Sequence, residues 1–212
     1  MSEDALIARL ARDLRPVRRL RPPGWRALGW VVLVLAVAAL VASRADLPAV
    51  RARLMAAPDM WLQAAGAVAT AISAALAALM LALPDRPRRW AWLPVPPLLV
   101  WIGASGMGCL RQDVAGLATA NLHEAMTTCL PSILLYSAIV GLPLGVLVWR
   151  AHPLRPGLVS LMAGLAAAAA SAALLWLTHP FDAGVTDLLV HGLAVLLVLL
   201  AARALGWAMA AR

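Results

Sequence analysis

Six long apolar segments limit what this chain can fold into more than any other feature of its sequence. A helix needs about 20 apolar residues to cross the hydrocarbon core of a bilayer, and each segment reaches or approaches that length. Apolar residues occupy every side of these helices, unlike the surface helices of a soluble protein. The six segments are Trp25–Ser43, Trp61–Leu83, Trp92–Gly108, Met126–Trp149, Leu158–Leu177 and Leu188–Trp207.

The composition of the whole chain supports this interpretation. Of the 212 residues, 63% are hydrophobic and only 13% are charged, and the mean hydropathy is +0.85. Soluble globular proteins are about half apolar and about one quarter charged. We therefore predict an all-α membrane protein with six transmembrane helices. Residues 25–212 should form this bundle, and residues 1–24 should form a cytoplasmic partner-binding segment and a linker.

The arginines predict how the bundle is oriented. All 18 basic residues are arginine; 14 of them fall on one side of the predicted bundle and four fall on the other. Arginine-rich short loops stay in the cytoplasm, so both termini should lie there. The net charge of +8 is thus explained by arginines that mark the cytoplasmic side. We therefore expect no direct contact with nucleic acid. The four external arginines are Arg44, Arg51, Arg53 and Arg111.

The segment before the first span has the pattern of a short amphipathic helix. Ser2 can cap its N-terminus, and Glu3 and Asp4 suit the positive end of the helix dipole. A helix of about 14 residues is not stable alone in water, so its apolar stripe needs a cover. Either the membrane surface or a groove on a partner protein can cover this stripe. The stripe consists of Leu6, Ile7, Leu10 and Leu14.

The side opposite the arginines carries both cysteines and most of the histidines. A disulfide is allowed on the oxidising side of a membrane, and thiolate and imidazole groups can instead bind a thiophilic metal. A third reading is that the cysteines pack as small apolar residues. The spacing matches no compact metal motif, so all three readings stay open. The residues concerned are Cys109, Cys129, His123, His179, Asp182 and His191.

The polar residues within the spans are mostly small hydroxyls, which usually donate to a helix backbone or to a neighbouring helix. They include Thr70, Ser73, Ser132, Ser137, Ser160 and Ser171. Transporters and pumps usually carry ionisable groups at this depth, and these spans have almost none. The sequence also lacks a Gly-rich phosphate loop, an HExxH motif and a CxxC motif. We therefore expect no enzyme activity and no cofactor.

Four local patterns occur in an order that points to one protein family. The chain begins with Glu3-Asp4-Ala5-Leu6-Ile7, which continues through Leu10-Ala11-Arg12-Asp13-Leu14 to Pro16-Val17. Cys129 stands at the head of span four, and Leu154-Arg155-Pro156-Gly157 precedes span five. His179-Pro180-Phe181-Asp182 then leads to Asp187 and His191. With the six spans, these patterns resemble the NrsF family of bacterial inner-membrane proteins, which are negative regulators of an extracytoplasmic-function sigma factor.

The resemblance implies a membrane-bound anti-sigma factor. Its N-terminal segment would hold the sigma factor away from RNA polymerase, and an external redox or metal signal would release it. The implied partner-binding residues are Asp4, Leu6, Ile7, Leu10 and Leu14. The implied sensing residues are Cys129, Cys109, His179, His191 and Asp182.

The match to the family pattern has one departure. Cys129 corresponds to the family's cysteine in span four, but His179 stands where the family has a second cysteine before a proline. Cys109 as the second thiol and a metal-responsive site with His179 and His191 both remain open. The alternative function is a small membrane transporter or channel for a metal or solute, with the histidine-bearing rim as its mouth.

Overall fold

The computed structural model describes residues 2–12, 20–56, 58–114, 125–178 and 185–210. Within these ranges the chain is 85% helical and has no strands. Six helical segments are long and apolar enough to cross a membrane, which confirms the predicted fold class and the six predicted spans. They are Pro23–Ala42, Asp59–Leu81, Arg88–Arg111, Leu130–Trp149, Pro156–Leu175 and Leu188–Met209.

Several spans begin at a proline, as the residue's fixed φ and missing N–H favour. Proline stands in the first two positions of α2 (Pro23–Ala42), α7 (Leu130–Trp149) and α8 (Pro156–Leu175). The other spans are α4 (Pro58–Leu81), α5 (Val95–Val114) and α9 (Val185–Ala210). Two short turns precede spans: the 3₁₀ turn η1 (Arg88–Trp92) and the π-helical turn η2 (Ala125–Cys129).

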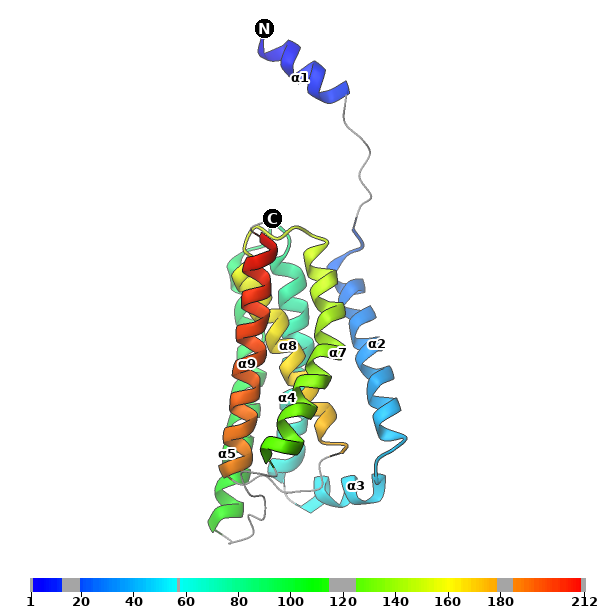
Figure 1. The fold of residues 1–212 in the computed structure, drawn as a ribbon, viewed down its shortest axis with the longest axis vertical. Helices are drawn as coiled ribbons and strands as arrows, with labels where there is room; N and C mark the ends of the chain where they lie inside the picture. The colour runs from blue at the N-terminus through cyan, green and yellow to red at the C-terminus, as the bar shows by residue number, and fades with distance from the viewer. Residues whose placement is uncertain (1, 13–19, 57, 115–124, 179–184, 211–212) are drawn as a thin grey trace.

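Both ends of the bundle can be followed in Figure 1. The start of α2 and the end of α9 lie at one end, which we call the arginine-rich end because it also carries the arginines of the α4–α5 and α7–α8 connections. A short helix, α3 (Leu47–Ala56), lies across the opposite end. We call this the cysteine end, because Cys109 and Cys129 belong to the helical ends there.

Helix α3 was missed by the sequence reasoning, which treated the first external connection as a loop. Its first turn is held by the Asp46 carboxylate, whose Oδ1 accepts the Ala49 N–H at 3.1 Å. Such a cap satisfies one of the N–H groups that a helix start leaves without a partner. The cap was visible in the sequence, but α3 is only ten residues long and lacks a marked apolar face. Periodicity therefore gave no sign of it.

Helix α8 is the centre of the bundle. It contacts α4, α7 and α9. Of the residues in its apolar stretch, 83% are buried inside the protein, against 11% in α2 and in the span of α9. Its middle is the run Ala166–Ala170, whose small side chains let neighbouring backbones come close. A Cβ added at Gly141 of α7 would stand 3.0 Å from the Cβ of Ala167. Glycine at position 141 thus allows close contact between α7 and α8.

Helices α4 and α5 meet even more closely. A Cβ added at Gly66 of α4 would stand 2.8 Å from the backbone nitrogen of Trp101 on α5. That distance is far inside van der Waals contact, and the obstacle is backbone, which cannot rotate away. Glycine at this position is therefore a requirement of the packing.

Four of the predicted hydroxyl groups donate as expected, whereas the buried Ser160 Oγ has no hydrogen-bond partner among the described residues. Thr70 Oγ1 donates to the Gly66 carbonyl at 2.7 Å, and Ser73 Oγ donates to the Ala69 carbonyl at 2.7 Å. Ser137 of α7 donates to Ser171 Oγ at 2.9 Å, and Ser171 donates onward to the Ala168 carbonyl at 2.8 Å. The bond between Ser137 and Ser171 joins α7 to α8. All four hydroxyl groups donate a hydrogen bond, as polar groups inside a protein usually do.

Helix α2, which follows the N-terminal segment, is held to the bundle near its start. Its fully buried residues are Arg26, Ala27 and Trp30. The Trp30 indole Nε1–H donates to the Val140 carbonyl of α7 at 2.8 Å. Pro143 lies in the next turn of α7 and removes one backbone hydrogen bond there. The Trp30 bond therefore ties α2 to the turn of α7 that precedes Pro143.

Candidate functional site

The predicted N-terminal helix is present as α1 (Glu3–Arg12). Ser2 caps it as predicted, since Ser2 Oγ accepts the Ala5 N–H at 3.3 Å. Glu3 and Asp4 occupy its first turn, where the helix dipole favours negative charge. Figure 1 draws α1 beyond the arginine-rich end of the bundle.

The apolar residues of α1 are open to the surroundings. Leu6 is 43% exposed and Ile7 is 58% exposed, and the described side chains of this helix are all of the exposed class. Leu10 lies within α1, but its side chain is outside the described residues, as is all of Leu14. Two of the four predicted stripe residues are therefore seen, and both are uncovered. Asp4 is exposed beside them.

The arginine-rich end brings several guanidinium groups together. Arg155 Nη1 donates to the Arg86 carbonyl at 3.3 Å, which joins the α7–α8 connection to the α4–α5 connection. Asp85 lies 3.7 Å from Arg86 in an exposed ion pair. Arg26 of α2 differs from the others because it is only 7% exposed.

Both cysteines lie at the opposite end and are buried. Cys109 of α5 is 5% exposed and Cys129 is 3% exposed, and neither is in a disulfide. Cys129 is the last residue of the π-helical turn η2 and the cap of α7. Turns of this kind are rare and are frequent at functional sites, so the local backbone singles out Cys129 in a way that the sequence did not.

The first half of α9 packs next to Cys129. Helix α9 contacts η2. His191 lies within the first two turns of α9. Ala194 of α9, Ile133 of α7 and Leu175 of α8 form a small core cluster separate from the main one. Cys129 therefore lies about one turn before this cluster, in a turn that contacts α7 and α9. His179 and Asp182, the other predicted sensing residues on this side, lie outside the described residues.

The predicted metal site is not assembled by the residues that can be described. Among the described part of the chain, no three side chains of His, Cys, Asp or Glu gather as a metal would need. Cys109, Cys129 and His191 thus do not form such a group with one another. The ligands that His179 and Asp182 would add are not described.

An ion pair beside Cys109 was not anticipated from the sequence. Arg111 Nη2 of α5 donates to Asp59 Oδ2 of α4 at 3.1 Å, and the Asp59 side chain is only 12% exposed. A Cβ added at Gly108 would stand 3.0 Å from the same carboxylate oxygen. The pair joins two spans whose residues are 52 positions apart, so no local signal could have revealed it.

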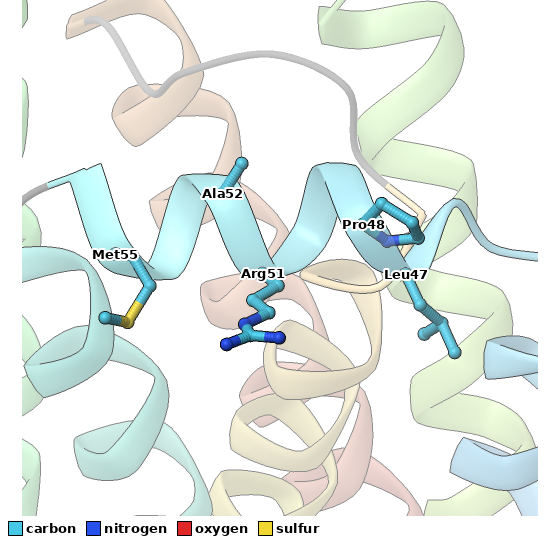
Figure 2. Close-up of a pocket in the computed structure, with 5 residues that line it drawn as sticks. All are labelled: Leu47, Pro48, Arg51, Ala52 and Met55. Atoms are coloured by element: carbon cyan, nitrogen blue, oxygen red, sulfur yellow. The ribbon is translucent and has the colours of Figure 1, made fainter.

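A surface hollow lies along α3 at the cysteine end (Figure 2). Its lining consists of Leu47, Pro48, Arg51, Ala52 and Met55, all from that one helix. Ligand sites usually combine polar groups from several elements. With a single charged group and a lining from one element, this hollow does not identify a ligand.

Comparison with known families gives a match over residues 10–211, to NrsF, described as negative regulator of sigma F. The match begins within α1 and covers all six spans, while the first turns of α1 precede it. No curated protein and no solved structure shows a significant match to this chain. Because the match covers nearly the whole length, the chain belongs to the NrsF family of negative regulators of a sigma factor.

Proposed function

We propose that this protein is an anti-sigma factor of the bacterial inner membrane that holds an extracytoplasmic-function sigma factor through α1. The bundle anchors α1 at the cytoplasmic face, with both termini in the cytoplasm. A redox or thiophilic-metal signal at the periplasmic cysteine end releases the sigma factor. Family membership supports a sigma factor as the partner, and the six apolar helices support the membrane anchor.

The observation that carries this proposal is the uncovered stripe of α1. Leu6 and Ile7 are exposed on a helix of ten residues, which is too short to be stable by itself. An amphipathic helix with anchors at this spacing is a common ligand for an apolar groove on a partner. The arginine-rich end, from which α1 extends, has the charge of a cytoplasmic face.

A pull-down with matched variants tests the binding role of α1. Leu6→Asp places a charge on the stripe, whereas Ala8→Asp places the same charge about 160° away around the exposed helix, at roughly 100° per residue. Each tagged full-length protein is solubilised from native-host membranes, and its partners are identified by mass spectrometry. Burial of one leucine contributes about 1.5–3 kcal/mol, so Leu6→Asp should reduce sigma-factor recovery at least tenfold.

The two variants separate the outcomes. Recovery of a sigma factor with the wild type and Ala8→Asp, but not with Leu6→Asp, supports the proposal. Equal recovery with all three proteins removes α1 from the binding site. Absence of any sigma factor with folded wild-type bait contradicts the partner, and vesicle flux assays would then test the transporter alternative.

The sensing role needs its own test, because the thiols are buried. We expect Cys129→Ser to shift the dose of oxidant or thiophilic metal that releases the sigma factor, as measured by co-purification. Cys109→Ser makes the same exchange at a similarly buried site and tests the second sensing cysteine, so an equal shift would place both thiols in the response. If the dose response is unchanged in Cys129→Ser, Cys129 acts only as a packing residue.

A further inference from the structure

Arg26 is a buried guanidinium at the start of the first span. It is the fourth residue of α2, and the side of the helix that it shares with Ala27 and Trp30 faces the bundle. Only 7% of the residue is exposed. Its Nη1 and Nη2 atoms are both covered, and neither has a hydrogen-bond partner among the described residues.

Among the residues that the structure describes, no carboxylate is paired with the Arg26 guanidinium. Arg150, at the end of α7, acts on it as a like charge. Asp85, in the connection between α4 and α5 at this end of the bundle, forms an ion pair with Arg86. The last carbonyls of α7 already accept backbone N–H groups: Val146 from Arg150, Val148 from Ala151 and Trp149 from His152.

A buried charge without a partner is costly, so an arrangement of this kind calls for an anion. The planar guanidinium donates two parallel hydrogen bonds, which fit the paired oxygens of a phosphate or a carboxylate. Basic pockets between membrane helices on the cytoplasmic side are known to take lipid headgroups. The depth also fits, because Trp25 next to Arg26 is 67% exposed, as an interfacial tryptophan would be.

We propose that Arg26, with Arg150 beside it, is a binding site for the phosphodiester of an anionic phospholipid, between α2 and α7. The headgroup reaches this site from the membrane at the start of α2, beside the exposed Trp25. It accepts hydrogen bonds from Nη1 and Nη2 and reduces the repulsion between the two arginines. The bound lipid then holds the span that carries α1 against the bundle.

This inference rests on the proposed orientation, with the arginine-rich end in the cytoplasm, but its test does not involve the sigma factor. The full chain in detergent is mixed with phosphatidylglycerol or phosphatidylcholine, and retained lipids are counted by native mass spectrometry. Arg26→Gln removes the guanidinium charge, and Arg88→Gln makes the same exchange at an exposed position of η1 at the same end. Inorganic phosphate is titrated in parallel, and unfolding midpoints are measured for every mixture.

The expected result is at least a tenfold weaker affinity for phosphatidylglycerol in Arg26→Gln, with Arg88→Gln close to the wild type. Phosphatidylglycerol, but not phosphatidylcholine, should raise the unfolding midpoint of the wild type. Equal affinity in Arg26→Gln, or an equal effect of phosphatidylcholine or of inorganic phosphate, would overturn the proposal. If Arg26→Gln does not fold, Arg26→Lys keeps the charge without the planar fork and should bind several-fold more weakly; unchanged binding would overturn the proposal.

Discussion

Replacing Trp30 by phenylalanine should loosen the attachment of α2 to the bundle. The variant loses the 2.8 Å hydrogen bond from Nε1 to the Val140 carbonyl, and such bonds between membrane helices contribute about 0.6 kcal/mol on average. Phenylalanine is also smaller by about 40 Å³, and an unfilled space of that size costs about 1 kcal/mol at roughly 24 cal/mol per Å³. Trp30 is 2% exposed, so little of this space can be refilled by solvent.

The expected loss is therefore about 1.5 kcal/mol, or roughly tenfold in the equilibrium for docking α2. Reversible unfolding in mixed micelles of SDS and a mild detergent measures this free energy. Trp25→Phe is the matched control, because Trp25 lies on the same helix and is 67% exposed. Equal stability of the two variants would refute the idea that Trp30 holds α2 in place.

Three further experiments test other contacts of the bundle. Gly66→Ala should lose about 1–3 kcal/mol of unfolding free energy, because its methyl group meets the backbone of α5; Gly103→Ala, which meets nothing within 4 Å, should lose none. Asp59→Asn should cost up to about 1 kcal/mol in low salt and less in high salt, since its arginine partner is partly exposed. A double-mutant cycle of Ser137→Ala and Ser171→Ala should give a coupling of about 0.6 kcal/mol, and zero coupling would mean that their 2.9 Å contact does not stabilise the fold.

The spans were predictable from the sequence because a bilayer imposes one length and one polarity on each of them. The predicted segments and the observed apolar helices correspond one to one. The short helix α3 was not predictable in this way, since Leu47–Ala56 lies outside the apolar segments and has no clear periodicity. The choice of α8 as the central helix also escaped the sequence, because all six spans are apolar on every side. Its run of alanines was the one hint.

The candidate site was predicted unevenly. The Ser2 cap and the exposed stripe of α1 follow from local spacing, which a sequence carries directly. The ion pair between Asp59 and Arg111 joins distant positions and depends on how two spans are packed. The burial of Arg26 likewise depends on the approach of α2 to α7, which no local pattern reveals.

The central place of α8 has a consequence for biosynthesis. It is the fifth of six spans to leave the ribosome, yet α4, α7 and α9 all pack on it. At about 5–20 residues per second, synthesis reaches Pro156 roughly 8–30 seconds after it begins, and four spans have been made by then. Helix α1 precedes all six spans, so it leaves the ribosome while the bundle still lacks its middle. If α1 holds the sigma factor as proposed, a newly made chain meets it before α8 has joined the bundle.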